Sequence, residues 1–503
     1  MLRSTVTAES APAIHRREAG ILLHPTSLPG PFDLGVLGAD ARRFVDLLES
    51  AGCRIWQTLP LGPVDRHLSP YMSSSTFAFN TRLIDFDSLS GLKWGPTDDE
   101  ISASRKWIGR ESVLDVIADR FDRWADPGEQ EELATFIRTE HEWLTPFCLF
   151  RAITLKHGGR PWQEWPLPLR HRDNTALEEI HQTDSGTLRR IRFEQFLARR
   201  QWNHLKEYAN RRGIAVFGDV PFYVAMNSAD VWWHRDLFEV DEDGAARNVA
   251  GVPPDYFSED GQLWGNPLYN WAAIERHDYR WWRQRIGVQC RLFDRLRIDH
   301  FRAIESYWAV SGPTAREGEW RTGPGDGLLA AVCEAAGPDT IVAEDLGMIT
   351  TEVRALRDRF ELPGMLVLQF AFDGSADNPF LPRNHVENAV AYTGTHDNDT
   401  TLGWYRTLDE ATRQYVGGVL GNPQPGMPDA LIDATLSSPA RMAILPMQDL
   451  LGLGPAARMN RPGTPEGNWA WRFDWAQVPA GLGARLGRQL AQARRIAADA
   501  AGA

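Results

Sequence analysis

Short apolar runs alternate with helical stretches along the chain. The runs are rich in Val, Ile, Leu and aromatic residues and read as buried strands. They cover residues 20–28, 54–62, 214–225, 295–303, 341–347, 365–372, 391–400 and 441–452. A helix is expected after the first run, capped by Asp40 and stopped by Gly52, and a last helix over 482–500. Eight strands alternating with helices predict an α/β fold, a (β/α)8 TIM barrel.

Two long gaps interrupt this alternation. Residues of about 64–210 are mostly helical in pattern, and residues of about 226–276 are rich in Gly, Pro, Asn and Asp. Both gaps follow predicted strands at their C-terminal ends, where such barrels build their sites. We therefore expect a catalytic barrel over 20–503 with helical and loop-rich insert subdomains, preceded by a flexible tail over 1–19.

Charge and composition narrow the classes of partner. The net charge of −13 argues against nucleic acid and anionic membranes, and favours an uncharged ligand. The four cysteines show no CxxC spacing and read as thiols in a reducing compartment, which predicts a cytoplasmic protein. The first 20 residues hold no apolar signal core, and no membrane span is expected. Most of the 20 Trp residues should pack in the core, and a minority could stack against sugar rings.

Three carboxylates stand at the ends of predicted strands. Asp299 ends RLRID, Glu344 ends IVAE, and Asp397 follows AYTGTH. The C-terminal strand ends of a barrel meet at one face, so these acids should lie close together. Carboxylates that converge in this way suggest an enzyme that acts on a glycosidic bond.

Each acid also has a structural explanation. Arg297 and Asp299 share the inward face of their strand, so they could form a buried ion pair, although His300 beside them favours a functional role. In that role Arg297 would keep Asp299 ionised, as a nucleophile requires. Glu344, or Asp345 after it, could cap the next helix, but the longer Glu344 suits a general acid whose pKa is raised by burial.

The remaining polar positions also allow both a structural and a functional explanation. Asp397 lies among short polar residues that are typical of a turn or cap, and His396 beside it could be a core histidine. The two could instead hold the vicinal hydroxyls of a sugar. Asp219, at the end of FGD, is expected to orient Arg297 or a nearby hydroxyl. No ligand spacing typical of a metal site is found, so no metal is expected.

An ordered series of motifs resembles one known family. The motifs are LHPTSLPGPFDLG (23–35), SPYMSSSTFAFN (69–80), GDVPFYVA with SADVW (218–232), PPDYFSEDGQLWGNPLYNW (253–271), RIDHFRA, AEDLG, GTHDNDT and QDLLGLGPAARMNRPGTPEGNWAWR (448–472). Together they resemble the 4-alpha-glucanotransferases, also called amylomaltases or disproportionating enzymes, of glycoside hydrolase family 77. The series spans nearly everything after residue 20. The chain departs from the family pattern at Asn227, where Asp is expected, and slightly in PFDLGVLG.

The resemblance implies a role for each residue of the site. Asp299 would be the nucleophile, Glu344 the acid/base and Asp397 the stabiliser of the transition state. The residues that would contact or support the sugar are Ser69, Tyr71, Asp219, Trp264, Arg297, His300 and His396. A mobile loop around 250–255 would cover the bound chain.

The implied activity is transfer of alpha-1,4-glucan segments to the 4-hydroxyl of another glucan, by a retaining double displacement through a covalent glycosyl-Asp intermediate. The expected ligands are maltooligosaccharides and amylose, with no cofactor, and the protein is expected to be a monomer or weak homo-oligomer. A retaining alpha-glucan hydrolase would use the same intermediate with water as acceptor. A non-catalytic glucan-binding protein is the other alternative, which the intact Asp–Glu–Asp set argues against. Neither the additional N-terminal domain of longer relatives nor a β-rich C-terminal domain is expected.

Overall fold

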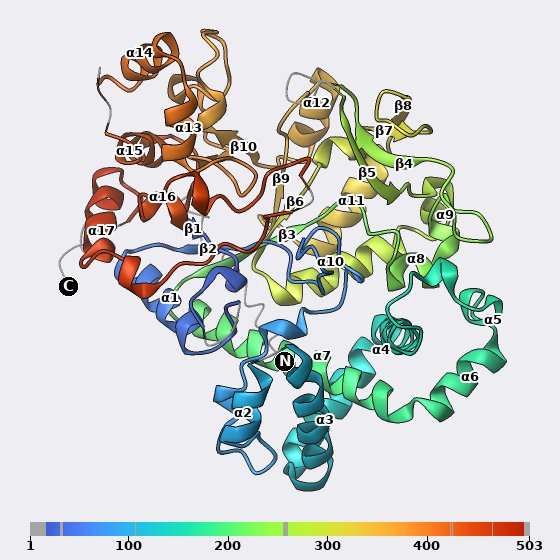
Figure 1. Ribbon diagram of the computed structural model, residues 1–503. Helices are drawn as coiled ribbons and strands as arrows, with labels where there is room; N and C mark the ends of the chain where they lie inside the picture. The colour runs from blue at the N-terminus through green and yellow to red at the C-terminus, as the bar shows by residue number, and fades with distance from the viewer. Residues whose placement is uncertain are drawn as a thin grey trace, which may run out of the picture.

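A parallel barrel forms the centre of the molecule (Figure 1). The computed structural model describes residues 17–30, 34–105, 107–254, 260–422, 424, 426–464 and 466–496. In this part of the chain the barrel strands are β1 (Glu18–Leu22), β2 (Ile55–Gln57), β3 (Ala215–Val220), β6 (Arg295–Ile298), β9 (Ile341–Ala343), β10 (Gly364–Val367), β11 (Ala389–Tyr392) and β12 (Met442–Pro446). They pair in the order β10-β11-β12-β1-β2-β3-β6-β9, and a hydrogen bond from Ala343 N–H to the Pro363 carbonyl (2.9 Å) links β9 to β10.

Alternating side chains of the strands fill two separate cores. Inside the barrel Ile55, Phe217, Val342 and Ile444 pack against one another, while their neighbours in sequence face the helices. Leu296 and Ile298 of β6 belong to this outer core, as the period of two in their strand predicts. Arg297 therefore points into the barrel.

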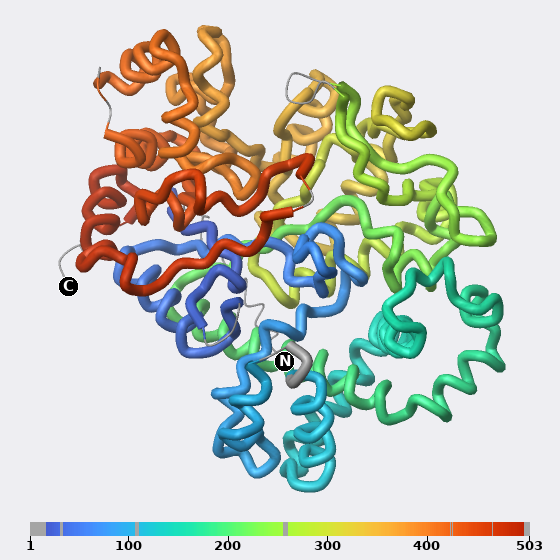
Figure 2. Tube along the Cα trace, in the orientation of Figure 1, coloured from blue at the N-terminus to red at the C-terminus, as the bar shows by residue number. Residues whose placement is uncertain are grey.

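The first and the last barrel strands pair with each other. β1 pairs in parallel with β2 on one edge and with β12 on the other. Figure 2 shows the red C-terminal segments lying against the blue N-terminal part of the chain. Glu18 and Ala19, at the end of the expected tail, already belong to β1.

The helices surround the barrel and build the first insert. Their bounds are α1 (Ala39–Ser50), α2 (Asp98–Ser104), α3 (Trp107–Trp124), α4 (Pro127–Lys156), α5 (Leu167–Arg170), α6 (Asn174–Thr183), α7 (Ser185–Arg211), α8 (Ala229–Trp233), α9 (Trp271–Arg276), α10 (Arg280–Leu292), α11 (Gly325–Ala336), α12 (Thr351–Arg359), α13 (Thr401–Thr407), α14 (Glu410–Val419), α15 (Asp429–Ser437), α16 (Met447–Leu450) and α17 (Leu482–Gln492). The insert between β2 and β3 holds α2–α7, and α7 also packs against α1 and β3. No helix in the described ranges has the length and apolar character that crossing a membrane requires.

A second sheet, which the sequence does not predict, rises beside the barrel. Its antiparallel order is β5-β4-β7-β8. The bounds of its strands are β4 (Val249–Val252), β5 (Gln262–Pro267), β7 (Ser306–Val310) and β8 (Gly318–Thr322). The Gly- and Pro-rich segment 226–276 therefore contributes a β-hairpin as well as loops.

Three expected element boundaries differ from the structure. Gly38, not Asp40, is the N-cap of α1, and Asp40 accepts a hydrogen bond from the Trp475 indole (2.6 Å) in the first turn. Helix α17 ends at Gln492, and the end of the expected helix lies outside the described residues. Ala250, expected at the start of a mobile loop, is buried in β4, whereas Asp255 lies outside the described residues.

Candidate active site

The three carboxylates stand at the C-terminal end of the barrel. Asp299 directly follows β6, Glu344 directly follows β9, and Asp397 lies on the loop between β11 and α13. None of them caps a helix, because Thr350 caps α12 and Thr400 caps α13. The alternative that Glu344 or Asp397 caps the next helix is thus excluded, although Asp397 does lie in a turn.

The buried guanidinium of Arg297 binds two of the predicted acids, and Tyr71 binds one of these acids. Arg297 donates from Nη1 to Asp219 (2.7 Å) and from Nη2 to Asp299 (2.8 Å). The Tyr71 hydroxyl donates to the same Asp219 oxygen (2.8 Å). The Asp219 side chain is 0% exposed and that of Asp299 is 28% exposed. The ion pair thus exists, and of the two acids it is Asp299 that a ligand can reach.

Two backbone N–H groups hold Glu344. His300 N–H donates to Oε2 (2.7 Å) and Leu346 N–H donates to Oε1 (2.9 Å). Asp345, next in sequence, turns away from the site and accepts hydrogen bonds from Arg357 and from Met365 N–H. The acid is therefore fixed in orientation by the loops that follow β6 and β9.

Burial controls the protonation of this pair. Burial, with a smaller contribution from the charge of Asp299, raises the pKa of Glu344 to about 7, against the influence of Arg297 and the two N–H donors. Burial also raises the pKa of Asp299 to about 6, with Arg297 opposing and Asp219 and Asp397 adding to the shift. Arg297 therefore favours the ionised Asp299 as expected, but burial outweighs it. Between these values Asp299 is ionised and Glu344 holds a proton.

Asp397 is held by residues that the sequence did not single out. Asn460 Nδ2 donates to Asp397 Oδ1 (2.6 Å), and Arg458 donates to the Asp397 carbonyl (2.6 Å). His396 Nε2 lies 3.4 Å from the same carboxylate. Asn460 and Arg458 follow β12, and their position after a strand's C-terminal end was the available signal.

Aromatic rings line the site next to Asp397. The Tyr71 ring stacks on His396, with 5.2 Å between centroids and planes 14° apart. Trp469, which the sequence also did not single out, lies 5.6 Å from Tyr71 and 5.9 Å from His396. Ser69 Oγ accepts the Tyr71 N–H (3.3 Å) and so helps to place the ring.

A second aromatic group lies on the side of Glu344. Trp264 meets His300 edge to face at 4.7 Å, and Tyr223 lies 6.2 Å from both rings. Burial, and to a smaller extent Arg302, lowers the pKa of His300 to about 3, so its imidazole is neutral. A neutral ring can donate one hydrogen bond and accept another, which suits the hydroxyl groups of a sugar.

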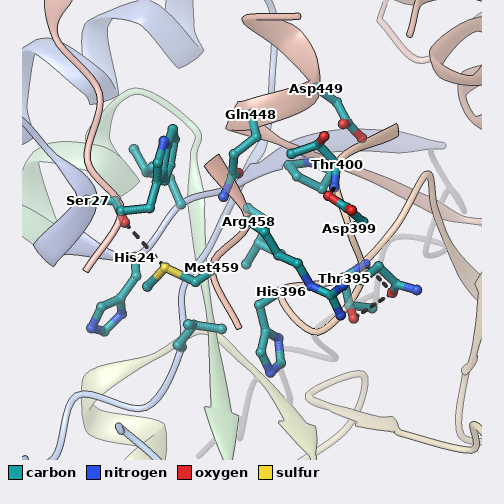
Figure 3. Close-up of a pocket in the computed structure, with 16 residues that line it drawn as sticks. His24, Ser27, Thr395, His396, Asp399, Thr400, Gln448, Asp449, Arg458 and Met459 are labelled. Carbon is teal, nitrogen blue, oxygen red and sulfur yellow. Dashed lines mark hydrogen bonds between the residues drawn. The ribbon is translucent and has the colours of Figure 1, made fainter. Parts of the chain in front are cut away.

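A small hollow lies beside His396, between the ends of β1 and β12 and the loop after β11. Figure 3 shows His24, His396, Gln448 and Arg458 around it. Burial lowers the pKa of His24 to about 3, so this ring is also neutral. Among the residues that the structure describes, no cluster of His, Cys, Asp and Glu could hold a metal ion. The groups that the site offers are carboxylates, aromatic rings, imidazoles and the guanidinium groups of Arg297 and Arg458.

The seven predicted contact residues thus fall into one site. Asp219, Arg297 and Tyr71 join Asp299; His396 and Ser69 join Tyr71; and Trp264 meets His300, whose N–H binds Glu344. Their roles toward a ligand stay predictions.

Known proteins share this architecture. A model of the family described as 4-alpha-glucanotransferase, glycoside hydrolase family 77, matches residues 23–477. The chain is 46% identical to a 4-alpha-glucanotransferase of Thermus thermophilus, over 95% of this chain and 98% of the relative. It is 43% identical to a 4-alpha-glucanotransferase of Synechocystis, over 94% of this chain and 97% of the relative.

A solved structure agrees with these relatives. The amylomaltase from Streptococcus agalactiae, in complex with acarbose, is 35% identical and superposes with a TM-score of 0.91, over 95% of this chain and 100% of that one. The barrel, the grouped carboxylates and the extent of these matches lead to one conclusion: the chain belongs to the 4-alpha-glucanotransferase family, glycoside hydrolase family 77.

Proposed function

We propose that this enzyme moves alpha-1,4-glucan segments between maltooligosaccharides or amylose chains by a retaining double displacement. The observation that carries this mechanism is the contrast between two neighbouring acids. Asp299 is ion-paired with Arg297, while burial raises the pKa of Glu344 to about 7. One acid is thus ready to attack and the other to give a proton.

In the first half of the reaction, Glu344 gives its proton to the glycosidic oxygen. A carboxylate oxygen of Asp299 attacks the anomeric carbon, the bond to the leaving oxygen breaks, and the leaving chain departs with a new hydroxyl. The sugar is then bound to Asp299 as an ester, and Glu344 is ionised. Asp397, held by Asn460 and Arg458, would stabilise the positive charge that develops on the sugar ring.

In the second half, the 4-hydroxyl of an acceptor glucan loses its proton to Glu344. Its oxygen attacks the anomeric carbon and the ester bond to Asp299 breaks, which restores both carboxyl groups. Two inversions retain the alpha configuration. The same steps with water as acceptor would give hydrolysis, so transfer rests on membership of the family and on the exclusion of water by a bound acceptor.

The remaining contacts suit an uncharged sugar. Tyr71 and Trp469 would pack against the donor ring, with His396, His300 and Arg297 contacting its hydroxyl groups. Trp264 would line the cleft near the bond that is cut. The net charge of −13 and the free cysteines support a cytoplasmic protein, which we propose is a monomer or weak homo-oligomer.

Maltotriose supplied as the sole substrate tests the proposal. We expect glucose together with maltopentaose and longer chains, at a constant total of reducing ends, because each transfer consumes one donor and one acceptor. Glucose and maltose with steadily rising reducing ends would mean that water is the acceptor and would overturn the transferase assignment.

A further inference from the structure

One face of the four-stranded sheet carries a row of apolar side chains that the proposed mechanism does not use. In the pairing of the strands Leu263 lies opposite Gly251, Gly251 opposite Trp308, and Trp308 opposite Trp320. Residues directly opposite one another share a face of the sheet. The row therefore runs across all four strands from β5 to β8.

The row is open at both of its ends. Leu263 is 46% exposed and Trp320 is 41% exposed, while Trp308 is half-buried. Gly251, between them, adds no side chain to the face. The neighbours Glu319 and Arg321 of β8 alternate to the opposite face, so they place no charge on the row.

The Trp320 ring is held in place before any ligand arrives. The Arg302 guanidinium lies over it at 4.1 Å, and the Trp308 ring meets it at 5.3 Å with planes 65° apart. Arg302 is itself fixed by hydrogen bonds to the Met348 carbonyl and to Ser306 Oγ (3.2 Å). A rigid exposed ring loses little freedom when a ligand packs on it.

The row begins beside the candidate active site. Trp264, next to Leu263 in β5, meets His300 on the other face of the sheet. Met348, which is 52% exposed, lies two positions beyond Leu346, whose N–H holds Glu344. Figure 1 shows β4, β5, β7 and β8 rising next to α12, which follows this loop. A chain that leaves the site past Glu344 would meet this row.

We propose that the row of Leu263, Trp308 and Trp320 is a binding surface for a long alpha-glucan, which packs the C–H faces of its sugar units on the Trp320 ring. The proposal rests on the proposed function, since it gives the surface to the acceptor chain that extends beyond the site. An uncharged, amphipathic ligand fits because the face offers the rigid, exposed Trp320 ring for the C–H faces of a sugar, with the Arg302 guanidinium on that ring as its charged neighbour. Short acceptors would end before reaching it.

Substitution of Trp320 separates long acceptors from short ones. For Trp320→Ala we expect kcat/KM with amylose to fall about tenfold, while kcat/KM with maltotriose stays unchanged. Trp124→Ala is the matched control, because Trp124 is 52% exposed on α3 in the helical insert and outside the row. Equal losses with both substrates, or no loss with amylose, would refute the proposal.

A binding assay with an inactive variant tests the surface separately from the proposed reaction. In an Asp299→Asn background, migration in a native gel that contains amylose should be retarded, and adding Trp320→Ala should reduce the retardation. This result would support the surface even if the parent enzyme failed to transfer maltotriose, which would overturn only the proposed function. Equal retardation with and without Trp320 would refute it. Light scattering that shows Trp320→Ala converting a dimer to a monomer would also refute the proposal, because the row would then be a contact between two copies of the chain.

Discussion

The pH dependence of the reaction follows from the two neighbouring acids. With pKa values of about 6 for Asp299 and about 7 for Glu344, the reactive form has Asp299 ionised and Glu344 protonated. More than half of the enzyme is in this form midway between the two values, and roughly a tenth is at pH 5 and at pH 8. Initial rates at low maltotriose should therefore give a bell-shaped kcat/KM that falls roughly sevenfold on each side.

A variant that lacks the proton donor, assayed with an activated substrate, shows which carboxyl group causes each side of the pH profile. In Glu344→Gln the first step should survive with alpha-maltosyl fluoride, because fluoride leaves without being protonated. The initial rate of fluoride release should still fall at acidic pH, where Asp299 becomes protonated. It should no longer fall at basic pH. A basic limb that persists in Glu344→Gln, or a parent profile that is flat from pH 5 to 8, would refute the protonation states described above.

Four further predictions concern the site and the core. Asp299→Asn should lower kcat by about three orders of magnitude or more, with maltoheptaose binding retained by calorimetry; loss of binding would argue against a nucleophile. Asn460→Ala frees the Asp397 carboxylate and should lower kcat up to about a hundredfold with little change in KM; a change in KM alone would contradict its positioning role. Phe44→Ala removes a fully buried ring packed on Trp56 and should lower the free energy of unfolding by about 3–5 kcal/mol, measured in urea. Dialysis against EDTA should leave the transfer rate unchanged, and inactivation restored by a divalent cation would reveal a missed metal site.

The pattern of short runs along the chain was enough to predict the barrel and the positions of its three carboxylates. Most barrel strands are short apolar runs, and β6 alternates Leu296 and Ile298 with two arginines. Asp299 directly follows β6, and Glu344 directly follows β9. The second sheet was missed because β4 contains Gly and lies in a stretch typical of loops, while β8 is mostly exposed. These strands are stabilised by one another and by the core beneath them, and a single run does not reveal such pairing.

Contacts between distant segments escaped prediction for the same reason. Asn460 and Asp397 belong to different loops, and only the closed barrel brings them within 2.6 Å. Asp40 read as a helix cap, but its carboxylate binds Trp475, which lies near the other end of the chain. The raised pKa of Glu344, by contrast, agrees with the expectation of a general acid whose pKa is raised by burial. The sequence predicted the place of each acid and the contacts of Arg297 with Asp219 and Asp299. It omitted neighbours on distant loops, such as Asn460 and Arg458.

The pairing of β1 between β2 and β12 has a consequence for biosynthesis. β1 leaves the ribosome long before β12, so one of its edges has no partner until Met442–Pro446 has been made. Arg495 then ties β1 further, through a hydrogen bond to the Glu18 carbonyl (2.8 Å). An apolar strand with a free edge invites pairing with other chains. The nascent enzyme should therefore depend on chaperones until β12 has been made, and chains that stop before residue 442 should aggregate.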